Sequence, residues 1–283
     1  MLRIKTRAGD GRKRSWRWAP MVLGGALAVG SIAAAAAMAT EQGREAVVGA
    51  TGALNAGLQA VPRHLLTESN SELVRGDNPR FQVQNAGAPW NYSVVGDQAR
   101  FEVRPGDSLP GDGKIKERSE IATSQKMKRG QPYEITFRFM VEPGPRNTAK
   151  WMTLTQMQAT PDPGEPGHSP PFAIEMVGER MRIITRTDPN LLASRETTIY
   201  TDHYTDNRDI ERGRWYRMRI LVRFDPSGDG FLHVFRDGDK LVNYRGALGF
   251  EDLVGPYWKE GVYRASSNES FAANFKGLEI TAR

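Results

Sequence analysis

The chain has 283 residues, with 39 Lys and Arg against 33 Asp and Glu, and a net charge of +6. Seven of these basic residues and one acidic residue lie in residues 1–18, so the remainder is neutral, with 32 of each sign, and we expect no binding to nucleic acid. Cysteine is absent, which excludes disulfides, cysteine nucleophiles and cysteine metal ligands.

The first segment of the chain, residues 1–39, has the layout of an export signal. A basic start leads into an uncharged run rich in Ala and Gly, which ends in Ala37-Met38-Ala39 before Thr40. This small-residue ending fits a signal peptide that is cleaved. If the segment is not cleaved, about 20 uncharged residues are enough to anchor a protein in a bilayer. We therefore expect a periplasmic or secreted protein, or one anchored in the membrane.

Residues 40–75 are small and polar, and we interpret them as a linker before a single domain at 76–283. Within that domain, alternating apolar and polar residues recur in short segments: 81–84, 99–103, 133–139, 172–176, 181–185, 216–222 and 231–235. Val177-Gly178-Glu179-Arg180 and Asp237-Gly238-Asp239 are predicted to be tight turns that join adjacent antiparallel strands, since Asp-Gly between alternating segments is typical of a hairpin. The pattern predicts an all-β fold, a sandwich or a jelly roll.

Two long loops are predicted to shape a binding site on the sheets of this fold. Residues 160–171 contain five prolines, which cannot donate to a strand ladder, and residues 187–214 form the second loop. They carry His168 and His203. Turn chemistry explains the aspartates of the remaining loops, so we expect no metal and no cofactor at Asp225, Asp229, Asp237 and Asp239.

The most informative stretch is 257–264. Side chains alternate on a strand, so Tyr257, Lys259 and Tyr263 share one face, and Gly261 leaves a gap between them that suits a ring-shaped anionic ligand. Each tyrosine alone would be interpreted as a core residue. Lys259 on the same face argues against this, because lysine is rarely buried without a partner.

The same alternation places polar pairs on one face of two earlier segments. Arg118 and Glu120 form the first pair, and Gln156 and Gln158 form the second. Alone, the first pair is an ordinary ion pair and the second is a solvent-facing pair of amides. Together with the 257–264 stretch they describe a polar concave face.

The order of these motifs resembles the jelly-roll polysaccharide lyases, a group that includes alginate lyases, glucuronan lyases and heparin lyase I-like proteins. The resemblance spans roughly residues 76–283 and rests on Arg118-Ser119-Glu120, Gln156-Met157-Gln158 and Tyr257-Trp258-Lys259-Glu260-Gly261-Val262-Tyr263. It implies a β-jelly roll of the concanavalin A-like sandwich type with a concave substrate-binding sheet. It also implies a lyase that cleaves a uronic-acid-containing polysaccharide by β-elimination. It further implies that Tyr263 is catalytic with Lys259 close by, and that Arg118 and Gln156 contact the substrate. The family usually has a histidine where this chain has Gln158.

β-Elimination requires a base for the C5 proton, an acid for the leaving oxygen, and stabilisation of the charge that grows on the carboxylate. Arg118 and Gln156 suit the carboxylate, since arginine binds carboxylates through two hydrogen bonds. Tyr263 suits the proton transfers, because Lys259 on the same face supplies the cation that a phenol needs to ionise. We assign Glu120 to orienting Arg118 or a sugar hydroxyl. Substrate-binding roles fall to Gln156, Gln158, Glu120, Tyr257 and His168.

Gln158 cannot take up a proton at neutral pH, which leaves three outcomes open. Tyr263 performs both proton transfers, or His168 or His203 reaches into the site, or the protein is weak or inactive. The last outcome makes a non-catalytic carbohydrate-binding protein of the same fold the alternative function. A glycoside hydrolase is disfavoured, because it requires two suitably placed carboxylates. The expected partner is an acidic polysaccharide, and we expect a monomer.

Overall fold

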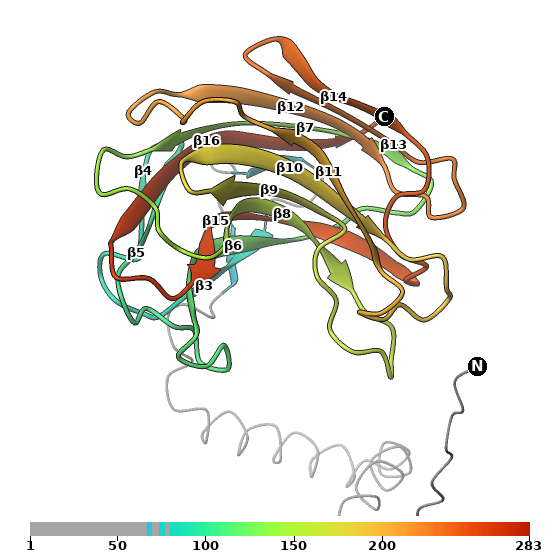
Figure 1. The fold of residues 1–283 in the computed structure, drawn as a ribbon, viewed down its shortest axis with the longest axis horizontal. Coiled ribbons are helices and arrows are strands. Elements are labelled where there is room, and N and C mark those ends of the chain that lie inside the picture. Colours follow the sequence, from blue (N-terminus) through green and yellow to red (C-terminus); the bar gives the residue numbers. More distant parts are fainter. Residues whose placement is uncertain (1–66, 70–73, 77–79) are drawn as a thin grey trace, which may run out of the picture. The chain divides into compact units, whose positions relative to one another are not determined.

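Sixteen strands build the part of the chain that the computed structural model describes, residues 67–69, 74–76 and 80–283. They form two curved sheets stacked face to face (Figure 1). Within the described residues there is no helix, and hence none that is long and apolar enough to cross a membrane. The predicted β-jelly-roll sandwich is confirmed.

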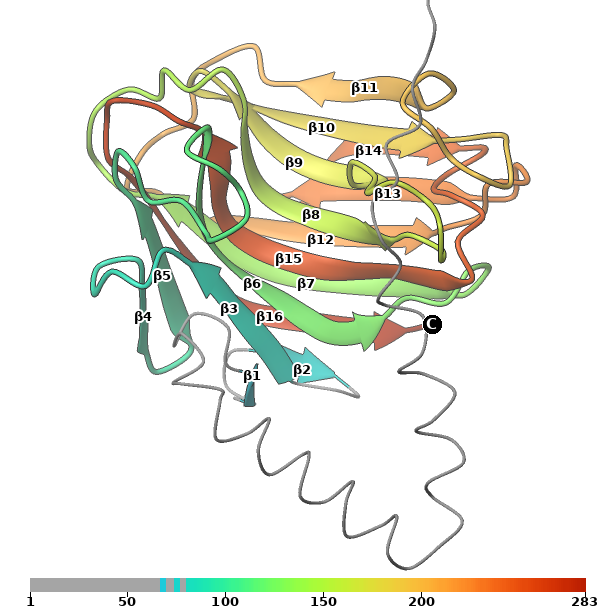
Figure 2. The same cartoon turned by 90° about the horizontal axis from the view of Figure 1, so that it is seen from below.

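The first sheet is antiparallel and carries the candidate site. Its order is β1 (Thr67–Ser69), β3 (Arg80–Asn85), β6 (Lys116–Lys126), β15 (Val254–Ala265), β8 (Met152–Thr160), β9 (Phe172–Val177), β10 (Arg180–Thr187) and β11 (Ile199–Thr205). Figure 2 looks onto this sheet, with β15 in its middle and β10 and β11 at one edge.

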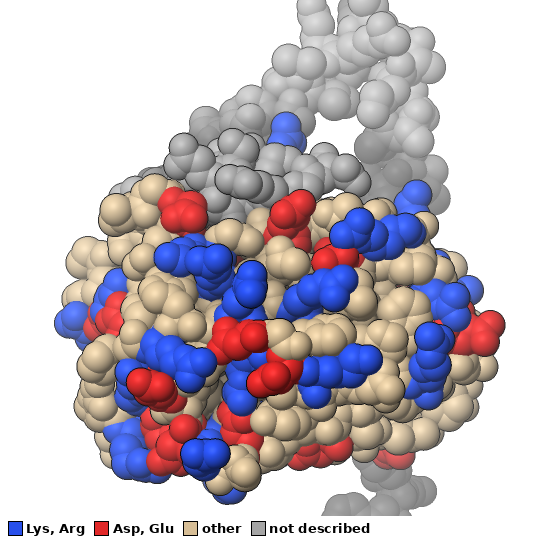
Figure 3. Space-filling view, turned by 90° about the horizontal axis from the view of Figure 1, so that it is seen from above, with Lys and Arg blue, Asp and Glu red and all other residues tan. Residues whose placement is uncertain are grey.

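The second sheet covers the back of the first. Its order is β14 (Asp239–Arg245), β13 (Phe231–Arg236), β12 (Tyr216–Arg223), β7 (Pro132–Val141), β16 (Phe271–Ala282), β5 (Gln98–Val103) and β4 (Tyr92–Val95). Strand β2 (Val74–Gly76) lies parallel to β16, whereas the other pairs are antiparallel. The outer face of this sheet carries many basic side chains with acidic ones between them (Figure 3).

The core lies between the two sheets and is rich in aromatic rings. Trp258 of β15 and Phe137 of β7 are fully buried, and their ring centroids lie 5.1 Å apart. Phe137 in turn stacks on Phe275 of β16. Truncating a buried ring of this size costs about 3–5 kcal/mol, so the sheet that carries the site is held firmly against its neighbour.

The predicted turns are confirmed, and one predicted loop is corrected. Val177 pairs with Arg180 and Arg236 pairs with Asp239, so both tight turns join neighbouring antiparallel strands. Residues 161–171 form a loop as expected. The predicted loop 187–214, however, contains strand β11, which pairs with β10. Strand β11 was missed because it is an edge strand with mostly exposed side chains, which gives no apolar alternation.

Strands β1 and β2 lie inside the stretch interpreted as a linker, residues 40–75, and β2 ends at Gly76. Because they pair with β3 and β16, the sheets begin before the predicted domain boundary. The predicted signal or anchor at 1–39 and the rest of the linker lie outside the described residues, so export stays a prediction.

Candidate functional site

Strand β15 shows the predicted alternation of faces. Trp258 and Val262 point into the core, whereas Lys259 and Tyr263 lie on the opposite, concave face. Gly261 has a φ of 138°, and a Cβ there would clash with the backbone of Ser119 on β6. We expected from the sequence that Gly261 leaves a gap for a ligand, and this expectation is wrong. The glycine allows the neighbouring strand to approach closely.

Glu120 is the centre of the polar group on the concave face. It accepts a hydrogen bond from Arg118 Nη1 at 2.8 Å and one from Gln156 Nε2 at 2.9 Å, and it forms an ion pair with Lys259. All but Arg118 are almost fully buried. Burial lowers the pKa of Lys259, and the charge of Arg118 acts in the same direction, while Glu120 opposes it. The structure thus joins three segments that are far apart in the sequence.

Arg118 is held by two carboxylates of the protein itself. Its Nε and Nη2 donate to the two carboxylate oxygens of Asp112 at 2.8 and 2.9 Å, and Nη1 also donates to Gln84. The guanidinium lies over the Tyr263 ring, 4.0 Å from its centroid. Arg118 was predicted to bind the substrate carboxylate. Its Nε and Nη2 hydrogens, which would bind a carboxylate in pairs, already bind Asp112. Asp112 itself was missed, because a single Asp in a glycine-rich turn carries no signal.

A groove of about 450 Å³ runs along the concave face beside Tyr263. The predicted residues that line it are Tyr263, Gln156, Gln158 and His168. The lining residues that we missed include Lys116, Arg186, Arg195 and Tyr200. Lys116 was detectable, because it lies two residues before Arg118 and strand alternation places both on one face. The others come from β10, β11 and the loop between them, far from any motif.

Tyr257 lies away from this groove. It lines a separate hollow of about 270 Å³ with residues of β3 and β6, and Lys126 Nζ lies 3.5 Å from its ring centroid. Burial raises the pKa of Tyr257, with the charge of Glu120 as a second cause. The two tyrosines that share one strand face therefore open onto different hollows.

The two loop histidines differ in position. His168 lines the groove, and its ring Nε2 lies 3.1 Å from Glu165 Oε2, while its carbonyl accepts a hydrogen bond from the Gln158 amide. The His203 ring forms a hydrogen bond with Thr185 Oγ1 at 2.7 Å and packs on Tyr244, between the sheets. Of the two histidines considered as replacements for the absent family histidine, His168 alone faces the groove, and it is engaged with Glu165.

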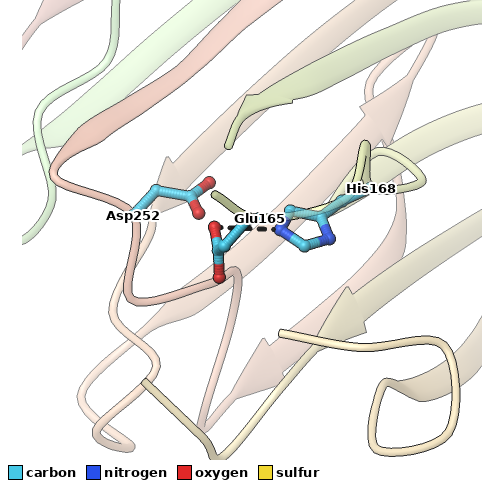
Figure 4. A group of neighbouring side chains, drawn as sticks. All are labelled: Glu165, His168 and Asp252. Atoms are coloured by element: carbon cyan, nitrogen blue, oxygen red, sulfur yellow. Dashed lines mark hydrogen bonds and ion pairs between the residues drawn. The ribbon is translucent and has the colours of Figure 1, made fainter. Parts of the chain in front are cut away.

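Glu165, His168 and Asp252 form a group whose ligand-type atoms all lie within 4.8 Å of one another (Figure 4). This spacing is compatible with a metal ion, and Glu165 also has hydrogen-bond partners within the protein. Glu165 accepts hydrogen bonds from the backbone amides of Asp162 and Ala193 in addition to its contact with His168. Burial and the Glu165 carboxylate raise the pKa of Asp252 to about 6. Glu165 and His168 belong to the 161–171 loop and Asp252 to the loop before β15, and the Ala193 amide ties the group to the loop before β11. Of the three side chains, His168 lines the groove.

Comparison with known proteins identifies a matching family and proteins of similar fold. The polysaccharide lyase family matches residues 82–277. No curated protein matches the sequence. The endo-β-1,4-glucuronan lyase from the fungus Trichoderma reesei has a similar fold, with a TM-score of 0.57 and 12% sequence identity over 76% of this chain and 89% of that chain. Alginate lyase AlgAT5 from Polysaccharide Lyase family 7 gives a TM-score of 0.51 and 13% identity over 76% of this chain and 99% of that chain.

Proposed function

Because the chain belongs to the polysaccharide lyase family, we propose that it cleaves a uronic-acid-containing polysaccharide by β-elimination, with Tyr263 transferring the protons. The observation that carries this proposal is the position of the Tyr263 ring. It lines the groove of the concave sheet, and the Arg118 guanidinium lies 4.0 Å from its centroid. A phenol in an open groove beside a fixed cation is suited to proton transfer.

In the proposed reaction the Tyr263 phenolate removes the proton from C5 of a uronate. The electrons of the C5–H bond form a C4–C5 double bond, and the bond between C4 and the glycosidic oxygen breaks. The departing oxygen takes the proton from the Tyr263 phenol. One residue performs both transfers, so proton and leaving group depart from the same face of the sugar. This assignment requires no histidine at position 158.

The substrate carboxylate must be stabilised while charge grows on it. Lys116 lines the groove beside Tyr263, with its Nζ 5.9 Å from the ring centroid. Gln156 and Gln158 line the same groove and offer amide hydrogens. We assign the carboxylate to these three side chains. Burial works against the charged form of Arg118, but the charges of Glu120 and Asp112 outweigh it and raise its pKa. The same two carboxylates hold the guanidinium beside the phenol.

Glucuronan and alginate are the first polymers to test, because similar folds occur in lyases named for them. Purified protein is mixed with a panel of acidic polysaccharides, and ultraviolet absorbance follows the unsaturated uronide that elimination creates. We expect absorbance to rise with at least one polyuronate. Binding of a polyuronate without any rise in absorbance would favour the alternative, a non-catalytic carbohydrate-binding protein. The absence of both binding and cleavage would contradict both functions.

A further inference from the structure

A second polar group lies on the concave sheet, at the edge formed by β9, β10 and β11. Arg182 pairs with Glu175 across β10 and β9, and Arg186 pairs with Tyr200 across β10 and β11. Arg182 donates to Glu175 Oε2 from Nε at 3.2 Å and from Nη2 at 2.5 Å. The guanidinium carbons of Arg182 and Arg186 lie 5.9 and 5.4 Å from the Tyr200 ring centroid.

Arg186 is poorly neutralised in this group. Its closest carboxylate oxygen, Glu175 Oε1, is 3.8 Å away and belongs to a side chain that already binds Arg182. Burial lowers the pKa of Arg186, and the charge of Arg182 adds to this effect. The charge of Asp202 makes a minor contribution to the raised pKa of Arg182.

The Arg186 guanidinium has hydrogen-bond donors to spare. Nη1 donates to the Pro170 carbonyl at 3.0 Å. Among the residues that the structure describes, Arg186 forms no other side-chain hydrogen bond, and Glu175 is its one ion-pair partner. A partly buried cation with spare donors is suited to an anion that arrives from the groove.

This group lies in the groove of Tyr263 but at a distance from it. Arg186, Arg195 and Tyr200 line the same groove as Tyr263 and Lys116. Across the sheet, Tyr263 of β15 pairs with Thr153 of β8, which pairs with Glu175 of β9, and Glu175 pairs with Arg182 of β10. Three strand spacings separate the backbones of Tyr263 and Arg182 by about 14 Å, and Arg186 lies four residues further along β10. This backbone separation is more than the length of one sugar ring. A polymer that reaches Tyr263 can therefore reach Arg186 only with a different sugar residue.

We propose that Arg186, supported by Arg182 and Tyr200, forms a second anion subsite that binds the carboxylate of a uronate remote from the cleaved bond. This subsite rests on the proposed function, because it shares the groove with Tyr263. Tyr200 is 46% exposed and presents its ring beside the guanidinium groups, where a sugar face packs. The subsite favours polymers in which successive sugars are uronates, and it disfavours polymers in which uronates are isolated.

The test variant is Arg186→Gln, which removes the cation but leaves the two hydrogen bonds from Arg182 to Glu175 in place. Arg186→Lys keeps the charge without the planar guanidinium. The matched control is Arg217→Gln, an equal change of charge at an exposed position of β12 on the second sheet. All variants are made together with Tyr263→Phe, so that the oligosaccharides are not consumed.

Affinity is measured by ligand-observed NMR titration with di- and hexasaccharides of glucuronate and mannuronate. We expect Arg186→Gln to weaken binding of the preferred hexasaccharide by about tenfold, with the disaccharide and the Arg217→Gln control unchanged. Arg186→Lys should recover part of the lost affinity.

Equal weakening of both lengths, no weakening of the hexasaccharide, or no hexasaccharide binding by the parent would each overturn the subsite. Lyase activity is scored separately on the chain with Tyr263 intact. A protein that binds hexasaccharides through Arg186 but does not cleave polyuronates would contradict the proposed function and leave the subsite standing. The subsite alone is contradicted if Arg186→Gln leaves both measurements unchanged. These are the cleavage rate with Tyr263 intact, and hexasaccharide affinity equal to that of the Arg217→Gln control.

Discussion

Glu260 is a fully buried carboxyl on the core face of β15, opposite the site. Its Oε2 accepts a hydrogen bond from Trp258 Nε1 at 3.0 Å. Burial raises the pKa of Glu260 from 4.5 to about 7, since the charged form is poorly solvated there, and the hydrogen bond from Trp258 offsets only part of this. The strand that carries Tyr263 and Lys259 therefore has a titratable group behind it.

This group predicts a pH dependence of stability. Below about pH 4.5 Glu260 is protonated in both the folded and the unfolded chain; between there and about pH 7 only the unfolded chain releases the proton. Its contribution to the free energy of unfolding should thus fall with rising pH across this window, by up to about 3 kcal/mol. Urea unfolding at several pH values, for wild type and Glu260→Gln, measures the difference. Parallel pH profiles for the two proteins would contradict the prediction.

At the scale of single residues, strand alternation predicted which side chains share a face but not which partners they choose. Glu120 was expected to orient Arg118 or a sugar hydroxyl, and it accepts a hydrogen bond from Arg118 Nη1 at 2.8 Å. The pairing of Asp112 with Arg118 depends on a loop that folds back over β6, which no local pattern specifies. Lys259 likewise contacts Glu120, whereas Arg118 lies over the Tyr263 ring at 4.0 Å, closer than Lys116. Partner choice among several charges is decided by tertiary distance.

At the scale of elements, Gly261 allows β15 and β6 to approach closely. Gly261→Ala should lower the free energy of unfolding by about 2–5 kcal/mol, because strain of the backbone adds to the clash of the new Cβ with Ser119. The control is Gly178→Ala, which has a φ of 58° and no atom within 4 Å of the new Cβ, and should cost only about 1–2 kcal/mol of backbone strain. Denaturant midpoints compare the two. Equal destabilisation would show that the contact with β6 is unimportant.

The elements themselves were predictable where burial imposes a period of two. Strand β12 has alternating buried and exposed side chains, and its existence followed from the sequence. Strand β11 has no such alternation, because it lies at the edge of the sheet and pairs on one side with β10. The order of the strands in the sheet was not predictable, since it depends on pairs such as β15 with β6 that are more than a hundred residues apart.

At the scale of the whole domain, one curved sheet brings together side chains from most of its strands. Tyr263 comes from β15, Lys116 from β6, Gln156 from β8 and Arg186 from β10, and all line one groove. The sequence predicted the β15 and β8 members. The members from β10 and β11 became visible only with the sheet order, because their signal is a position across the sheet and not a motif along the chain.

The most direct test of this account is the rate of uronide formation by Tyr263→Phe, followed by ultraviolet absorbance on the polymer that the wild type cleaves. Phenylalanine retains the ring that packs against Arg118 and Trp151 and lacks the proton-transferring oxygen. We expect the rate to fall by about two to four orders of magnitude, with the fold and binding of the polymer retained. A variant that folds and still cleaves at a rate close to that of the wild type would contradict the account.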